Sequence, residues 1–92
     1  DMRSQAKHME SELGKITAEG SAVWNKVKMV VDGNRNIQSI NIDEELLQPS
    51  EKKKLEEALV EAHKDALKKM QFALAKKLQE MGGLDALKNI GA

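Results

Sequence analysis

Residues 23–43 read VWNKVKMVVDGNRNIQSINID, and two runs within them alternate between apolar and polar side chains. Alternation with a period of two gives a strand one apolar face and one mostly polar face. Between the runs, residues 32–36 supply Asp, Gly and Asn, which tolerate the backbone angles of a tight reversal. The stretch therefore predicts a β-hairpin with one half-buried face. Its apolar positions are Val23, Val27, Met29 and Val31 in the first strand and Ile40 and Ile42 in the second.

The residues before this hairpin predict a helix and a third strand. Met2, Ala6, Met9 and Leu13 are spaced by four, three and four residues, which is typical of the apolar stripe of an amphipathic helix over residues 1–13. Gly14 is suited to end that helix. Residues 16–21 alternate weakly and are predicted to pair with the hairpin, so residues 16–43 form a three-stranded antiparallel meander.

The residues after the hairpin predict a long helix. Asp43 is placed to cap a short helical turn, and Pro49 restarts the chain. Residues 50–81 contain no Gly or Pro, and as one helix they would be about 48 Å long at 1.5 Å per residue. The apolar residues of this helix form two seams, of which the first is predicted to pack on the sheet and the second on another helix or a second subunit. The first seam is Leu55, Leu59, Ala62 and Ala66, and the second is His63, Leu67, Met70, Leu74, Leu78 and Met81.

The length and composition set limits on the class of protein. Ninety-two residues predict a single domain over residues 1–92 with a modest core, in which residues 84–92 form a tail that packs in a partner-dependent way. The absence of cysteine excludes disulfides and thiolate metal sites and is compatible with a cytoplasmic protein. No apolar run reaches the roughly 18 residues of a membrane span.

The charges cancel over the whole chain but not along it. Fifteen basic and fifteen acidic residues give a formal net charge of zero, which argues against strong attraction of the whole molecule to nucleic acid. Residues 62–79, however, contain five lysines and Asp65 as the single acidic residue. These lysines are either a solvated helix face, with Asp65 and Lys69 paired one turn apart, or a set of phosphate contacts.

The sequence predicts neither catalysis nor a metal or cofactor site. His8 and His63 lie far apart, and neither belongs to an H-E-x-x-H pattern. The glycine-rich phosphate-binding patterns and the G-x-S-x-G pattern are also absent, so no small-molecule substrate is expected. Trp24, Lys26 and Lys28 share a strand face in this interpretation. That face is either partly covered or, as the less favoured alternative, a stacking platform for single strands.

The order of elements, together with one long segment, resembles the YbaB/EbfC family of nucleoid-associated proteins. The segment is residues 25–69, NKVKMVVDGNRNIQSINIDEELLQPSEKKKLEEALVEAHKDALKK. Its most specific part is VKMVVDG followed by NIQSINIDEELL, and then an A-x-x-D-A segment that here runs from Ala62 to Ala66. The resemblance covers nearly the whole chain and implies an α+β fold of helix, three-stranded antiparallel meander and long helix.

The resemblance also implies a cytoplasmic homodimer, intertwined and associated with the nucleoid, whose paired helices project like the arms of tweezers. These helices would bind double-stranded DNA with relaxed sequence preference, without a cofactor. A non-enzymatic protein-interaction adaptor, with only indirect effects on DNA, is the alternative. The candidate DNA contacts are Arg3, Lys7, Lys64, Lys68, Lys69, Lys76 and Lys77. The candidate residues of the dimer interface are Met9, Leu13, His63, Leu67, Met70, Leu74 and Leu78.

Overall fold

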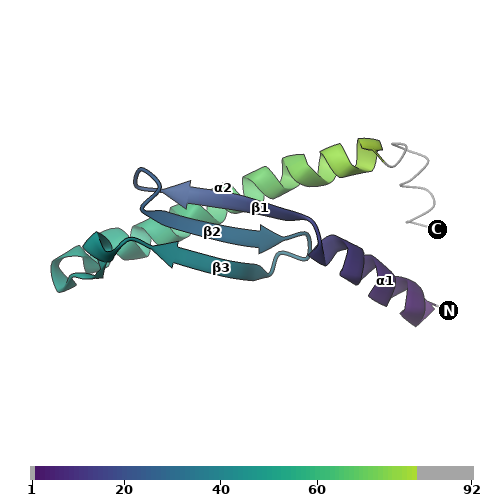
Figure 1. Ribbon diagram of the computed structural model, residues 1–92, viewed down its shortest axis with the longest axis horizontal. Coiled ribbons are helices and arrows are strands. Elements are labelled where there is room, and N and C mark those ends of the chain that lie inside the picture. Colours follow the sequence, from purple (N-terminus) through teal and green to yellow (C-terminus); the bar gives the residue numbers. More distant parts are fainter. Residues whose placement is uncertain (1, 81–92) are drawn as a thin grey trace.

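A computed structural model describes residues 2–80 and confirms the predicted order of helix, three strands and long helix (Figure 1). The predicted tail at residues 84–92 and the last position of the second seam, Met81, lie outside the described residues. The elements are helix α1 (Met2–Gly14), strands β1 (Thr17–Ala22), β2 (Val27–Asp32) and β3 (Ile37–Ile42), the short 3-10 helices η1 (Glu44–Leu47) and η2 (Pro49–Glu51), and helix α2 (Lys52–Glu80).

The three strands form one antiparallel sheet in the order β1-β2-β3. Met29 in the central strand lies opposite Gly20 in β1 and Ile40 in β3, so these three residues belong to one face of the sheet. The pairing of β2 with β3 shifts between Val30 and Val31. The predicted meander is therefore confirmed.

The prediction that the central strand begins at Val23 is wrong. Val23, Trp24 and Asn25 have φ angles of 53°, 55° and 67°, which belong to the left-handed region and cannot continue a strand. These residues form the turn between β1 and β2, and Trp24 is 94% exposed at its tip. The nearby Lys26 forms an ion pair with Glu45 of η1. The expected face shared by Trp24, Lys26 and Lys28 is consequently absent from β2, and Trp24 is not covered within this chain.

Asp32 organises the turn between β2 and β3, which the sequence predicted correctly. Its side chain is 2% exposed, and Oδ1 accepts hydrogen bonds from the backbone N–H groups of Asn34 (2.8 Å) and Asn36 (3.0 Å). Oδ2 accepts a third, from Nε2 of Gln38 at 2.6 Å. The hydrogen bond from Asn36 is the main reason that the pKa of Asp32 is lowered from its ordinary value of 3.8, because it stabilises the ionised form.

Asp32 should make the stability of the fold depend on acid pH. Since its pKa is lowered in the folded state, its stabilising effect is complete above pH 3.8 and is lost as the pH falls through the lowered pKa. Asp32→Asn is therefore expected to melt at a lower temperature than the wild type at pH 7, with a difference that shrinks towards pH 2.5. Thermal unfolding followed by circular dichroism measures this. An equal difference at both pH values would contradict the assigned role.

Helix α2 packs closely on the sheet through a stripe of small residues. Ala58, Ala62 and Ala66 are at most 1% exposed and lie at intervals of one turn. Opposite them, a Cβ atom added to Gly20 would lie 2.2 Å from the backbone oxygen of Ala62 and from the backbone nitrogen of Ala66. The backbone of β1 and the helix therefore meet with no room for a side chain between them. The buried hydrophobic core consists of Val27, Met29, Val31, Leu46, Ala58, Ala62, Ala66 and Met70.

The two predicted seams of the long helix are only partly correct. Ala62 and Ala66 of the first seam are buried against the sheet, and Leu55 and Leu59 pack at its margin. Met70 was assigned to the second seam, but it is 2% exposed and belongs to the core of this subunit. The reason is geometric. Positions four residues apart advance by about 40° around a helix. The side of α2 that contacts the sheet therefore changes along the helix, from residues of the first seam to residues of the second.

Strand β3 keeps apolar side chains that α2 does not cover. Ile40 lies opposite Met29, and Ile37 lies opposite Val31, so both isoleucines face the same way as the buried residues of β2. Helix α2, however, packs mainly on β1 and β2. As a result Ile37 and Ile40 remain 49% and 47% exposed. Leu47, in η1 after the strand, is 59% exposed.

The molecule is elongated, with extents of 52 × 24 × 15 Å. Helix α1 and the distal half of α2 leave the sheet at the same end and diverge, while the start of α2 and the 3-10 helices lie at the other end (Figure 1). None of the residues of α1 is buried. The fold thus places two helical arms side by side beyond one end of a small sheet.

Candidate nucleic-acid interface

The two arms enclose an apolar cleft. Its volume is about 260 Å³, and α1 and the distal half of α2 both contribute to its walls. The chain turns sharply at the base of α1, where the N–H of Gly33 donates to the carbonyl oxygen of Leu13 at 2.9 Å, so the β2–β3 turn fixes where the arm begins. The lining residues are Met9, Glu12, Leu13, Ile16, Leu74, Lys77 and Leu78.

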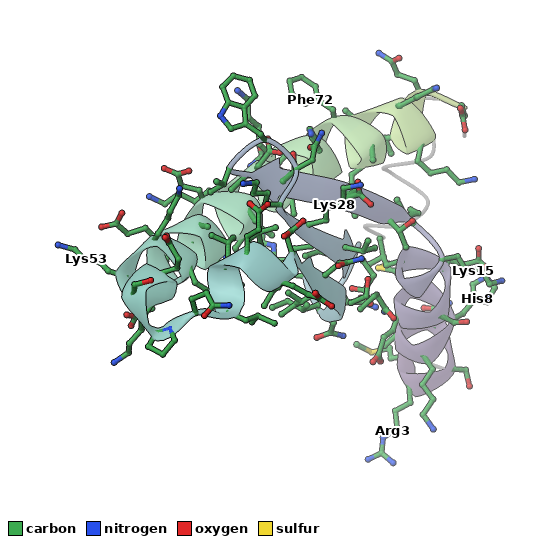
Figure 2. All side chains as sticks on the ribbon, turned by 60° about the vertical axis from the view of Figure 1, so that its left-hand side comes forward. Arg3, His8, Lys15, Lys28, Lys53 and Phe72 are labelled. Carbon is green, nitrogen blue, oxygen red and sulfur yellow. The ribbon has the colours of Figure 1, made fainter. Side chains whose placement is uncertain are left out.

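The distal half of α2 has a second, opposite face. At about 100° per residue, Phe72 points roughly 160° away from Leu74, and Lys68 and Lys76 lie within about 40° of Phe72. Phe72 is 68% exposed, and both lysines are also exposed. In Figure 2, Phe72 projects on the side of the molecule away from α1 and Arg3. We call the surface formed by Lys68, Lys69, Phe72 and Lys76 the outer face of α2.

Asp65 connects this outer face to the sheet. Its Oδ2 atom accepts a hydrogen bond from the backbone N–H of Ser21 in β1 at 2.9 Å. The same oxygen lies 3.0 Å from Nζ of Lys69, as predicted from the spacing of four residues. The hydrogen bond from Ser21, followed by that from Lys69, lowers the pKa of Asp65 from its ordinary value of 3.8. The carboxylate is therefore ionised throughout the physiological range of pH.

The cleft carries charges of both signs at its rim. Glu12 of α1 forms an ion pair with Lys15 at 3.2 Å, and the hydrogen bond from Lys15 is the main cause of the lowered pKa of Glu12. Lys77 lines the cleft from α2, and its charge also lowers the pKa of Glu12. Lys77 therefore faces the other arm, on a different side of α2 from Lys68 and Lys76.

The structure divides the seven candidate DNA contacts into four groups. Arg3 and Lys7 are exposed on α1, and Figure 2 shows Arg3 near the outer end of that helix. Lys64, Lys68 and Lys76 are exposed on α2, with Lys64 on the part of the helix that still packs on the sheet. Lys69 is paired with Asp65, and Lys77 lines the cleft.

The candidate interface residues are also divided. The cleft brings together Met9, Leu13, Leu74 and Leu78, which come from both predicted helices. His63 and Leu67 are half-buried on α2 before it leaves the sheet. Met70 lies in the core and has almost no surface to offer a partner.

Three features of this region were missed from the sequence. As a lone aromatic in a lysine-rich helix, Phe72 has no periodicity of its own, although its spacing of four residues from Lys68 and from Lys76 can be read from the sequence. Asp65 was noted as a partner for Lys69, but its hydrogen bond to Ser21 joins residues 44 positions apart, which no local pattern reveals. The uncovered face of β3 depends on where the helix crosses the sheet.

Within residues 2–80, no helix is both long and apolar enough to cross a membrane. The same part of the chain contains no group of three or more His, Asp or Glu side chains placed to hold a metal ion.

Comparisons with known proteins agree with the resemblance found in the sequence. A model of the YbaB/EbfC DNA-binding family matches residues 1–84. A nucleoid-associated protein of Bradyrhizobium sp. (strain ORS 278) is 35% identical over 82 residues, which are 89% of this chain and 77% of that protein. A nucleoid-associated protein of Rhodopseudomonas palustris (strain BisB5) is 35% identical over 91 residues, which are 98% of this chain and 86% of the relative.

A solved structure shares the fold. The crystal structure of the uncharacterized protein HP0035 from Helicobacter pylori superposes with a TM-score of 0.62, covering 87% of this chain and 93% of that one. The sequence identity is 18%, so this likeness concerns the fold.

Proposed function

Because this chain belongs to the YbaB/EbfC DNA-binding family, we propose that it is a nucleoid-associated homodimer that binds double-stranded DNA with relaxed sequence preference. The relatives from Bradyrhizobium and Rhodopseudomonas carry the name nucleoid-associated protein, which supports a location on the bacterial nucleoid in the cytoplasm and a role in organising the chromosome or regulating expression. The observation that supports a DNA-binding surface is the outer face of α2, which projects from the molecule and bears lysines.

The contacts in this proposal are made to phosphates. Lys68 and Lys76 are flexible cations on the outer face of α2, and Lys64 is an exposed cation one turn before them, so the three can follow a DNA backbone without reading base edges. Acidic side chains are more frequent towards the start of the same helix, where Glu56, Glu57 and Glu61 line a shallow depression together with Val60 and Lys64. Binding through the distal arm reconciles a local positive face with a chain whose total charge is zero.

A second copy of the chain is proposed to cover the apolar surfaces that one subunit leaves exposed. Ile37 and Ile40 of β3 form one such surface, Leu47 of η1 is also exposed, and the cleft between α1 and α2 forms another. Exposed apolar patches of this kind mark association sites in soluble proteins. Of the predicted interface residues, Met9, Leu13, His63, Leu67, Leu74 and Leu78 remain candidates, and Met70 is left out because it is already buried.

The test is a mobility-shift titration of a mixed-sequence duplex at several salt concentrations, with the same preparation examined by sedimentation equilibrium. We expect a mass twice the 10.2 kDa of one chain and an affinity that falls steeply between 50 and 200 mM salt, because each phosphate contact releases counterions. Similar affinities for unrelated duplexes are also expected. Absence of a shift at 50 mM salt would contradict the function and favour the protein-interaction adaptor.

A further inference from the structure

The outer face of α2 contains one anion among its cations. Asp65 points within about 20° of Phe72 around the helix, and Lys68, Lys69 and Lys76 all lie within about 60° of Phe72. The side chain of Asp65 is 32% exposed, so its negative charge contributes to the electrostatic potential at the surface. A DNA backbone that follows this face from Lys76 towards the sheet therefore approaches a carboxylate at the proximal end.

The position of this carboxylate is fixed by the sheet. Ser21 belongs to β1, an outer strand of the sheet, and its N–H donates to Oδ2 of Asp65 across 2.9 Å. Gly20, the preceding residue, is packed directly against the backbone of Ala62 and Ala66. Asp65 is thus held at the place where strand and helix are most tightly joined, and turning its side chain away would leave the Ser21 N–H without this partner.

Lys69 forms an ion pair with the carboxylate of Asp65. Its Nζ atom lies 3.0 Å from the same Oδ2 atom, and its side chain is 52% exposed. If Lys69 left Asp65 to contact a phosphate, a bare carboxylate held by Ser21 would remain beside that phosphate. If Lys69 stays, it contacts Asp65 instead of DNA. In both cases the pair contributes no net positive charge, and the release of counterions depends on net neutralisation of phosphate.

We propose that Asp65 limits the affinity of the α2 arm for DNA by fixing a negative charge within the outer face and by occupying Lys69, a role that rests on the proposed DNA-binding function. Lys69 is then a positioning residue for Asp65, while Lys68 and Lys76 contact the duplex. The alanines of the A-x-x-D-A segment thereby pack closely on the sheet, while its aspartate lowers the affinity for DNA.

A double-mutant cycle tests this role in the full chain, with binding to a mixed-sequence duplex measured at several salt concentrations. The variants are Asp65→Asn, Lys69→Gln, the two combined, and Lys68→Gln as the matched control. Asparagine keeps an oxygen that accepts from Ser21 but removes the charge. At 100 mM salt we expect Lys68→Gln to weaken binding by about eightfold, as loss of one phosphate contact. Lys69→Gln should also weaken binding, because it uncovers the carboxylate of Asp65 beside the phosphates.

Asp65→Asn is expected to bind about eightfold more tightly, with a salt slope steeper by about 0.9, because Lys69 then gains a phosphate. Adding Lys69→Gln should return the affinity close to that of the wild type. Unchanged affinity of a folded Asp65→Asn protein would overturn the proposed role, and so would a double variant that binds as weakly as Lys69→Gln alone. If Asp65→Asn fails to fold by thermal unfolding, Asp65→Ser replaces it in the cycle, because serine also removes the charge and keeps an oxygen that can accept a hydrogen bond. Failure of the DNA-binding function itself is recognised separately, since no variant, including Lys68→Gln, would then alter binding.

Discussion

Gly20→Ala is expected to lower the free energy of unfolding by about 3 kcal/mol or more, the upper part of the range for overpacked cores. The added Cβ would lie 2.2 Å from two backbone atoms of α2 and 2.6 Å from Cα of Ala66. Flexible side chains could move aside, but backbone atoms of a regular helix cannot. The strand and helix must therefore separate along their whole contact, which also weakens the hydrogen bond between Ser21 and Asp65.

Gly14→Ala provides the control. A Cβ at Gly14 would meet only Nδ2 of Asn34, at an ordinary distance of 3.8 Å. Alanine also has a higher helix propensity than the glycine that it would replace at the end of α1. Chemical denaturation of both variants should show Gly14→Ala within about 1 kcal/mol of the wild type. A Gly20→Ala protein as stable as Gly14→Ala would show that α2 does not approach β1 as closely as described.

The second large effect concerns DNA binding. Replacing Lys64, Lys68 and Lys76 together by glutamine is expected to weaken binding by roughly 500-fold at 100 mM salt. Three phosphate contacts per subunit account for about 2.7 in the slope of log affinity against log salt. These side chains are exposed, so the melting temperature should stay close to that of the wild type. The variant is measured by the same duplex titration as the wild type.

Lys52, Lys53 and Lys54 allow a control with the same change in charge. They are exposed at the opposite end of α2, where Figure 2 shows Lys53 projecting away from the arms. Their replacement by glutamine removes three positive charges from the chain without altering the outer face. Only a small loss of affinity is expected, since charges farther from the duplex than the Debye length of about 10 Å at 0.1 M salt are largely screened.

Much of the fold follows from local sequence. The alternating residues and the turn residues between them predicted the end of β2 and the whole of β3 within a residue or two, although β2 begins at Val27 and not at Val23. Asp43 caps η1 as expected, since its side chain accepts from the N–H of Glu45. The absence of Gly and Pro predicted the length of α2. These features depend on neighbours in the chain, which a sequence displays directly.

The errors arise where distant residues meet. Val23 and Trp24 continue the alternation of the strand, yet they adopt a left-handed turn because β1 must reverse and pair with β2 from Ala22 onwards. Met70 follows the apolar seam of the free arm, but the angle at which α2 crosses the sheet places it in the core. Neither the crossing angle nor the turn conformation is encoded in the period of the apolar residues.

The candidate site shows the same division. Lysine content alone indicated the distal part of α2, and the spacing predicted the pair of Asp65 and Lys69. The sequence could not separate Lys77, which lines the cleft, from Lys76, which lies on the outer face. That separation depends on where α1 lies, and α1 is placed by the hydrogen bond between Gly33 and Leu13.

The salt dependence of duplex binding by the two triple-lysine variants, measured side by side, tests most directly whether Lys64 and the outer face of α2 contact DNA. Replacing Lys64, Lys68 and Lys76 is expected to reduce the magnitude of the salt slope by about 2.7 per subunit, while replacing Lys52, Lys53 and Lys54 should leave it nearly unchanged. Equal slopes for the two variants, or a greater loss in the second, would contradict the proposed DNA contacts.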